Sequence, residues 1–254
     1  MIRRRLTANL KAQNWTAITV DLLIVVIGVF LGIQASNWNQ GRLEKRETRE
    51  LLRQLSPELH RLSNFSDRAA NYYETSREYA ETAFAGWRND PVVGDRDFVI
   101  AAYQASQILG IPNDGQSWAL VFGAEKLRQI DDPQVRAELA RLMTYNYDQL
   151  SNTTVATPYR QHVRQVIPDS IQQQIRANCG DVQAPDSALI LPARCNIGLP
   201  QAEVAKAAAD LRRHPELVAE LDYHLSEVAS LLGRLTRFVR GVRQVADQID
   251  RSVS

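Results

Sequence analysis

The chain has 254 residues, with 30 Lys and Arg against 29 Asp and Glu, which gives a formal net charge of +1. This balance argues against a nucleic-acid-binding protein, because such proteins usually carry a basic excess on one domain. Charged residues make up 23% of the chain and aromatic residues 7%, values that are ordinary for a globular protein and do not indicate disorder.

One long apolar run, from Ala17 to Ile33, lies near the N-terminus between Trp15 and Trp38. A helix from Trp15 to Trp38 would rise roughly 34 Å, close to the ~30 Å hydrocarbon thickness of a bilayer with a Trp at each interface. The run therefore predicts a single membrane span. We expect a basic cytoplasmic tail at 1–14, a transmembrane helix at 15–38 and an extramembrane helical-bundle domain at 39–254.

A cleaved signal peptide is the alternative interpretation of this run. Its purest apolar core, Leu22–Ile33, has a length more typical of a signal peptide than of a span. Against cleavage stand Trp15 and Asp21 in the flank, and the large Ile33 where a cleavage site prefers a small residue. We therefore expect an uncleaved anchor.

The orientation of the span depends on charges that nearly balance across it. The basic residues on the two sides are Arg3, Arg4, Arg5 and Lys11 before the span, and Arg42, Lys45, Arg46 and Arg49 after it. Three glutamates, Glu44, Glu47 and Glu50, interleave with the second set, as on a solvated helix face. We expect the N-terminus in the cytoplasm and the body in the periplasm, with the span in a bacterial inner membrane.

The two cysteines support that orientation. Cys179 and Cys195 flank a segment with Gly, two Pro and no helical period, and a bridge across such a loop persists outside the cytoplasm. In the chain-entropy model it would stabilise the fold by roughly 3 kcal/mol. The alternative is two unrelated buried thiols. A zinc site at these cysteines is not expected, because no His pair lies near them.

Helical periodicity continues after the span to about Trp87, with apolar residues at three- and four-residue steps. Pro57 interrupts the pattern, and Ser56-Pro57-Glu58 is a good helix start, so either the helix kinks there or a new one begins. Turn residues follow between Arg88 and Gly94.

Shorter helices are expected in the middle of the chain. The pattern predicts helices from Asp95 to Ile108 and from Gln116 to about Phe122. A longer pattern begins at Asp131-Asp132-Pro133 and reaches Ile175, with Pro158 and Pro168 expected to bend or split it.

The C-terminal third contains the clearest helix. After an irregular loop at 177–199, in which only Ala188–Leu191 suggests a strand, a short helix is expected from Pro200 to Arg212. From His214-Pro215 a heptad pattern of apolar residues, typical of a coiled coil, continues to the end. The fold class is therefore all-α: one transmembrane helix followed by a bundle of long, partly kinked helices.

The stretch from Asp21 to Gln40, DLLIVVIGVFLGIQASNWNQ, resembles an uncharacterised bacterial family of single-pass membrane proteins. The signature of that family is an acidic residue followed by an apolar span that ends in Asn-Trp-Asn. A weaker similarity covers SWALVFGAEKLRQIDDPQVRAELARLMTYNYDQL. The resemblance implies a membrane anchor with a helical extramembrane domain and implies no activity.

Three features of the span and the last helix are candidate functional residues. Asp21 is an ionisable group in an apolar helix, which either snorkels to the headgroups or couples ion movement, as in partners of ion-driven transport motors. Gly28 and Gly32 have the spacing that allows two membrane helices to approach closely. Arg234, Arg237, Arg240 and Arg243 form either a solvated face or a surface for an anionic partner or lipid headgroups.

No catalytic motif is recognisable. The four histidines, His60, His162, His214 and His224, show neither an HExxH pair nor an adjacent carboxylate at ligand spacing, so neither a catalytic nor a metal role is expected of them. Aromatic residues in the first half of the body, Tyr72, Tyr73, Tyr79, Trp87, Tyr103 and Trp118, either line a ligand pocket or form helix contacts.

The leading hypothesis is a non-enzymatic, membrane-anchored accessory, scaffold or sensor-like subunit that binds another membrane protein or itself, without a cofactor. The alternatives are a periplasmic domain that senses a small ligand and an ion-coupled transport partner that uses Asp21.

Overall fold

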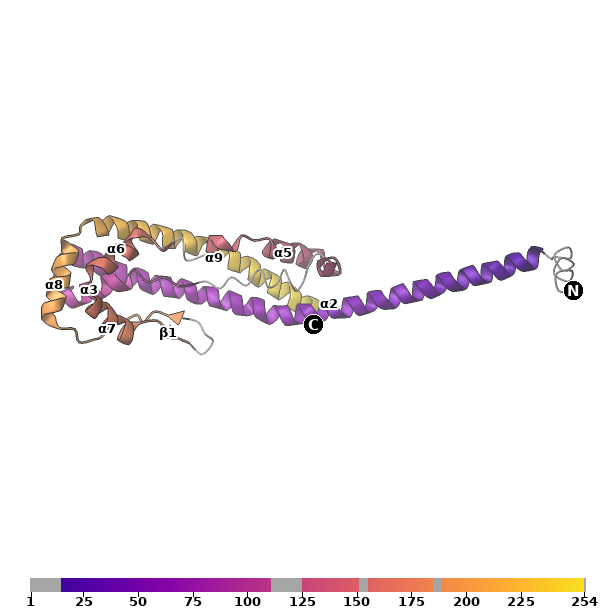
Figure 1. The fold of residues 1–254 in the computed structure, drawn as a ribbon, viewed down its shortest axis with the longest axis horizontal. Helices are drawn as coiled ribbons and strands as arrows, with labels where there is room; N and C mark the ends of the chain where they lie inside the picture. The colour runs from indigo at the N-terminus through magenta and orange to yellow at the C-terminus, as the bar shows by residue number, and fades with distance from the viewer. Residues whose placement is uncertain (1–14, 111–124, 151–154, 185–188, 254) are drawn as a thin grey trace, which may run out of the picture. The chain divides into compact units, whose positions relative to one another are not determined.

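The computed structural model describes all residues except 1–14, 111–124, 151–154, 185–188 and 254, and it confirms the all-α fold (Figure 1). The helices are α2 (Trp15–Trp87), α3 (Asp95–Gln104), α5 (Pro133–Met143), the 3-10 helix η1 (Tyr147–Leu150), α6 (Pro158–Val166), α7 (Asp169–Cys179), α8 (Gln201–Arg212) and α9 (Glu216–Val253). Two short strands, β1 (Val182–Gln183) and β2 (Leu189–Ile190), pair antiparallel with Val182 opposite Ile190.

Helix α2 is 73 residues long and continues through Pro57, so no new helix begins there. The side chain of Pro57 is exposed, while Leu55 and Leu59 on either side of it are buried. The proline therefore lies on the solvent face of the helix, where its ring does not disturb the buried stripe.

The chain divides into unit 1 (Met1–Leu51) and unit 2 (Leu52–Ser254), and α2 passes through the boundary. The extramembrane domain expected from residue 39 stays a prediction, because α2 continues without interruption past Trp38 and the boundary between the two units reflects packing within the chain. In unit 1, every side chain from Val20 to Gln40 is exposed. This stretch is long enough and apolar enough to cross a membrane, which agrees with a single-pass membrane protein.

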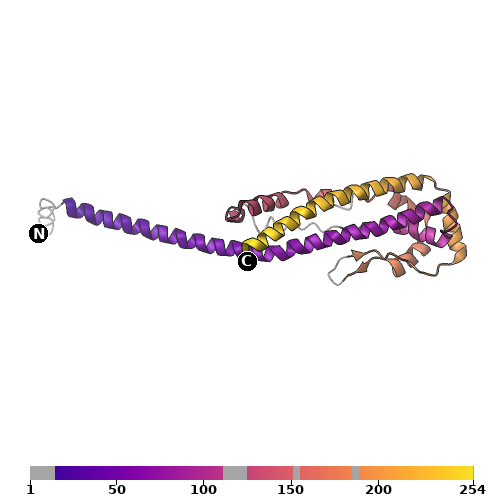
Figure 2. The ribbon, with the colours of Figure 1, turned by 180° about the vertical axis from the view of Figure 1, so that it is seen from behind.

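Unit 2 is built on two long antiparallel helices, the later part of α2 and α9 (Figures 1 and 2). Arg53 donates to the carbonyl of Val253 at 3.1 Å, and Arg243 donates to Asp67 at 2.7 Å, so the unit-2 part of α2 begins where α9 ends. Their buried faces carry the periodic apolar residues that the sequence indicated, including Leu59 and Leu62 on α2 and Leu221, Val228 and Leu235 on α9.

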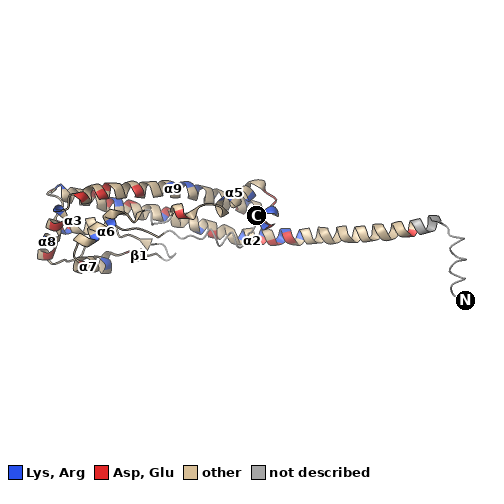
Figure 3. Cartoon of the chain, turned by 45° about the horizontal axis from the view of Figure 1, so that its top comes forward, with Lys and Arg blue, Asp and Glu red and all other residues tan. Residues whose placement is uncertain are grey.

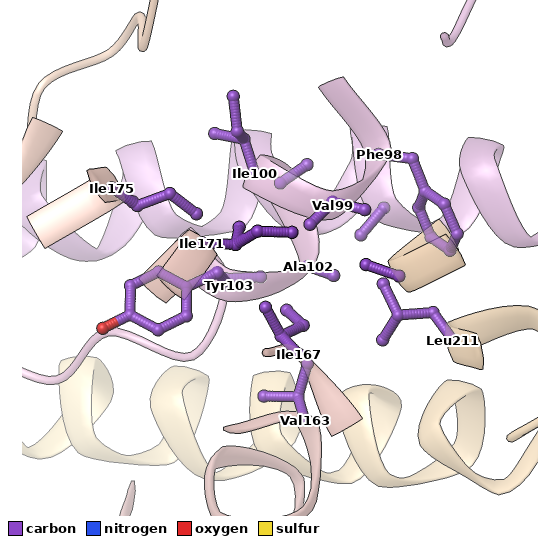
Figure 4. Packing of buried hydrophobic residues seen from close by; sticks show 14 of the residues in the cluster. Phe98, Val99, Ile100, Ala102, Tyr103, Val163, Ile167, Ile171, Ile175 and Leu211 are labelled. Atoms are coloured by element: carbon purple, nitrogen blue, oxygen red, sulfur yellow. The ribbon is translucent and has the colours of Figure 1, made fainter. Parts of the chain in front are cut away.

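Helix α3 forms the centre of the hydrophobic core. All its residues from Phe98 to Gln104 are buried, and α6 and α8 contact it (Figure 4). Gly86 of α2 faces Phe98 so closely that a Cβ on Gly86 would lie 2.1 Å from the phenylalanine ring. The absence of a side chain at Gly86 is therefore what allows α2 to approach α3.

The helical pattern from Asp131 to Ile175 is split at Pro158 and Pro168, as expected, but it also breaks earlier, because α5 ends at Met143 and η1 follows it. Asp132 caps α5 by accepting hydrogen bonds from the backbone of Gln134 and Val135. Pro158 is the first residue of α6, and Pro168 lies immediately before α7. In contrast, the helix expected to reach Ile108 ends at Gln104. The helix predicted at 116–122, with Trp118, lies outside the described residues.

Candidate functional site

The predicted anchor is apolar from Leu22 to Ile33, and α2 carries no Lys, Arg, Asp or Glu between Asp21 and Arg42 (Figure 3). Asp21 and Trp38 are exposed, and the guanidinium of Arg42 lies 4.9 Å from the centre of the Trp38 ring. A Cβ on Gly28 or Gly32 would meet no other atom within 4 Å, so this face of the helix is open. The side chain of Trp15 lies outside the described residues.

Cys179 and Cys195 form a disulfide, as predicted, with a sequence separation of 16 residues. The bridge joins the end of α7 to the segment before α8, and the β1–β2 hairpin lies in the loop it closes. Cys179 is buried within the hydrophobic core, so the bridge connects that core to an otherwise irregular loop.

A partly buried polar network surrounds Tyr103 and the last residues of α3. Arg164 donates to the hydroxyl of Tyr103 at 3.1 Å and to Gln107 at 3.1 Å, and its guanidinium lies 4.5 Å from the centre of the Tyr103 ring. Arg160 donates to the carbonyl of Ser106. These contacts satisfy the backbone where α3 ends and anchor α6 against it.

Tyr72 and Asp181 extend this network. The hydroxyl of Tyr72 donates to Asp181 at 2.9 Å. Burial raises the pKa of Tyr72, and the negative charge of Asp181 raises it further. Burial also raises the pKa of Asp181, whereas the hydrogen bond from Tyr72 and the charge of Arg160 act to lower it. The hydrogen bond between Tyr72 and Asp181 favours a structural role for this pair, because it joins α2 to the segment that follows α7.

The aromatic residues singled out in the sequence are mainly core residues. Tyr72, Tyr73 and Tyr103 are buried, and Tyr73 both donates to the carbonyl of Leu109 and accepts from its backbone N–H. The indole of Trp87 donates to the carbonyl of Leu211 at 3.1 Å. These contacts favour the interpretation of helix packing over that of a ligand pocket.

Two hydroxyl–histidine arrangements resemble fragments of a catalytic triad, and geometry argues against both. The hydroxyl of Thr157 lies 2.8 Å from Nδ1 of His224, but His224 is fully buried and no substrate reaches it. In the second arrangement, the carboxylate of Asp250 lies between Ser56 and His60. Its Oδ1 accepts a hydrogen bond from the hydroxyl of Ser56, and its Oδ2 lies 2.9 Å from Nε2 of His60. In a catalytic triad the imidazole lies between the hydroxyl and the carboxylate. Here the carboxylate lies between the other two groups, so His60 does not activate Ser56.

His162, His214 and Glu216 converge at the start of α9, with Glu220 beside them. Nδ1 of His214 lies 2.8 Å and Nε2 of His162 lies 3.8 Å from Oε1 of Glu216. Nδ1 of His162 lies 3.2 Å from Glu220. The hydrogen bond from His214 and the nearby charge of His162 lower the pKa of Glu216. His162, His214 and Glu216 each offer a ligand atom, and these atoms lie within 4.8 Å of one another.

This cluster was not predicted from the sequence, where no histidine was expected to have an adjacent carboxylate at ligand spacing; Glu216 lies 2.8 Å from His214, so that expectation was wrong. The local signal was present in His214-Pro215-Glu216, where a histidine precedes a helix that begins with a glutamate. His162 lies on α6, far away in the sequence, and only the fold brings it to this pair.

The second half of the arginine run of α9, Arg240 and Arg243, lines a groove of about 480 Å³ between α2 and α9, whereas Arg237, like Arg234, lines a separate hollow on α9. Arg243 donates to Ser63 and to Asp67, so part of its charge is already used. Arg240 and Asp247 also line the groove. Arg234 lies elsewhere and donates to the carbonyl of Gln149. Because acidic and basic groups alternate, the groove does not select an anion by charge alone.

No protein-family model, curated protein or solved structure matches this chain.

Proposed function

We propose that this chain is a non-enzymatic membrane-anchored subunit, held in a bacterial inner membrane by its single span. Its N-terminus lies in the cytoplasm and its helical bundle in the periplasm. It acts as an accessory or scaffold protein by associating, through its span, with another membrane protein or with a second copy of itself.

The observation that carries this proposal is the exposed apolar surface from Val20 to Ile33. Such a surface is unstable in water and requires lipid or another protein to cover it. Within it, Gly28 and Gly32 lie one helical turn apart and leave open space beside the backbone. In lipid, small residues at this spacing favour close approach of a second helix, because packing rather than hydrophobic burial drives association there.

The disulfide and the buried polar residues support the remaining parts of the proposal. A Cys179–Cys195 bridge persists in the periplasm and is rare in the cytoplasm. Two groups of kinds that can perform chemistry, the hydroxyl of Tyr72 and the imidazole of His224, are engaged inside the fold by Asp181 and Thr157 respectively. An accessory role requires no such groups.

The particle mass of the full-length protein, purified in mild detergent, tests this function. We expect a mass above that of one chain, from self-association or from a co-purifying membrane protein. Changing Gly28→Ile together with Gly32→Ile should reduce it to that of a single chain. The matched control is Val26→Ile with Phe30→Ile, about 200° around the helix from the glycines, which should leave the mass unchanged. A strict monomer without any partner would contradict the proposal.

A second candidate function, sensing of a small ligand by the bundle, is favoured by the groove between α2 and α9. A ligand that binds there must raise the melting temperature by mass action. Thermal-shift screening of the full-length protein against small metabolites distinguishes the two, since the accessory role predicts no metabolite that binds in this groove and stabilises the bundle.

A further inference from the structure

We propose that His162, His214 and Glu216 form a binding site for a divalent transition-metal ion of the zinc class. Two imidazoles on different segments converge on one carboxylate, with His214 Nδ1 2.8 Å and His162 Nε2 3.8 Å from Glu216 Oε1. The site goes beyond the accessory function, because membrane anchoring and association do not depend on it.

The donor set matches zinc. Imidazole nitrogen and carboxylate oxygen bind Zn²⁺ at about 2.0–2.2 Å, usually in tetrahedral geometry. Two ligand atoms on one tetrahedral ion then lie about 3.4 Å apart. The three atoms here lie within 4.8 Å of one another, so movements of about 1 Å by exposed side chains would complete the coordination.

Glu220 supplies an outer partner for one ligand. Its carboxylate oxygens lie 3.3 and 3.2 Å from Nδ1 of His162. An imidazole that donates one N–H to a carboxylate presents the lone pair of its other nitrogen to a metal, and this arrangement recurs behind zinc-bound histidines. Here the other nitrogen, Nε2, is the one nearest Glu216. Glu220 is therefore a positioning residue and not itself required as a ligand.

The three candidate ligands lie next to buried residues that fix the backbone, while their own side chains are partly exposed to solvent. His162 lies on α6 near the buried Tyr159 and Val163, and Glu216 precedes the buried Leu217. The side chains of His162, His214 and Glu216 remain 27%, 40% and 50% exposed, respectively. An ion can therefore enter from solvent, and three protein ligands leave a fourth position for water. Bound metal would join α6 to the turn between α8 and α9.

His60 provides an internal comparison. It also lies 2.9 Å from a carboxylate, that of Asp250, and its side chain is 40% exposed, like that of His214. No second imidazole belongs to that pair in the part of the chain that the structure describes. A single histidine and one carboxylate bind zinc weakly, so His60 is a matched control.

The test is a zinc titration of tag-free, full-length protein in detergent, first stripped with a chelator and then titrated in competition with a chromophoric zinc indicator. We expect one Zn²⁺ per chain, with affinity reduced more than about 100-fold by His214→Ala and by Glu216→Gln, and about 10- to 100-fold by Glu220→Gln. His60→Ala should bind as the wild type does. Cobalt(II) in place of zinc should show the intense visible absorption of a four-coordinate ion.

His214 lies in an exposed turn, so His214→Ala should unfold at the same temperature as metal-free wild type, which separates a lost ligand from a lost fold. The proposal is overturned if binding does not saturate at one ion per chain, if His214→Ala retains wild-type affinity, or if His60→Ala weakens binding as much. An unchanged affinity in Glu220→Gln would remove the positioning role of Glu220.

Discussion

The hydroxyl oxygen of Thr157 lies 2.8 Å from Nδ1 of His224, and the imidazole is fully buried. Its other nitrogen, Nε2, makes no hydrogen bond within the described residues. Burial, with a further contribution from the charge of Arg160, lowers the pKa of His224 to about 4. The fold therefore holds this histidine in its neutral form.

The stability of unit 2 should depend on pH through His224. Because the pKa is about 4 in the folded chain and 6.5 in the unfolded chain, the unfolded chain binds more protons between these values. The free energy of unfolding therefore falls as the pH is lowered from 6.5 to 4, by about 3 kcal/mol from this group. Thermal unfolding in detergent at pH 7 and pH 4 measures this fall. In His224→Phe the free energy of unfolding should fall by about 3 kcal/mol less than in the wild type over this pH range. An equal fall in both proteins would contradict the lowered pKa of His224.

Gly86→Ala should destabilise the contact between α2 and α3. A Cβ at this position would lie 2.1 Å from the ring of Phe98, and such overpacking costs about 1–3 kcal/mol. A lower melting temperature in detergent checks this. The control is Gly233→Ala in α9, whose Cβ would meet its nearest atom at 3.9 Å. That change should raise stability, because Ala favours a helix over Gly by about 1 kcal/mol.

Reduction of the disulfide should destabilise the bundle by about 3 kcal/mol, the entropy expected for a loop of this length. The melting temperature of the wild type should fall with a reductant, whereas Cys179→Ser with Cys195→Ser should melt at the lower temperature with or without it. Wild-type protein taken from cells should also resist alkylation until it is reduced. Free thiols in that protein would place the body in the cytoplasm.

Arg164→Lys should weaken the attachment of α6 to α3. A lysine carries the same charge but lacks the planar group that reaches Tyr103 and Gln107 together and stacks on the tyrosine ring. We expect a loss of about 1–3 kcal/mol. Arg77→Lys, at an exposed position of α2, should leave the melting temperature unchanged. Equal effects of the two changes would contradict this assignment.

Periodicity alone predicted the long helices because each buries one continuous face. The stripe that contains Leu221, Val228 and Leu235 is visible in the sequence and is buried in the structure. Pro57 could not be interpreted locally, since its effect depends on the face it occupies. Once Leu55 and Leu59 are known to be buried, its exposed position explains why the helix continues.

Only part of the candidate metal cluster could have been predicted from the sequence. His214 and Glu216 are close in the chain, so a possible pair could have been recognised there. His162 and Glu220 add the second imidazole and its partner, and their contact depends on how α6 packs against α9. No local pattern encodes that packing. The disulfide was easier to predict, because both cysteines flank one irregular loop.

The retention of the intact chain in membranes tests the central claim most directly, because anchoring by the run from Ala17 to Ile33 underlies the proposed function. Membranes from cells that make the protein are washed at alkaline pH, and the mass of the chain is measured in the pellet and in the supernatant. We expect a chain that still contains the apolar run from Ala17 to Ile33 and remains in the pellet. A chain that has lost the apolar run and appears in the soluble fraction would contradict it.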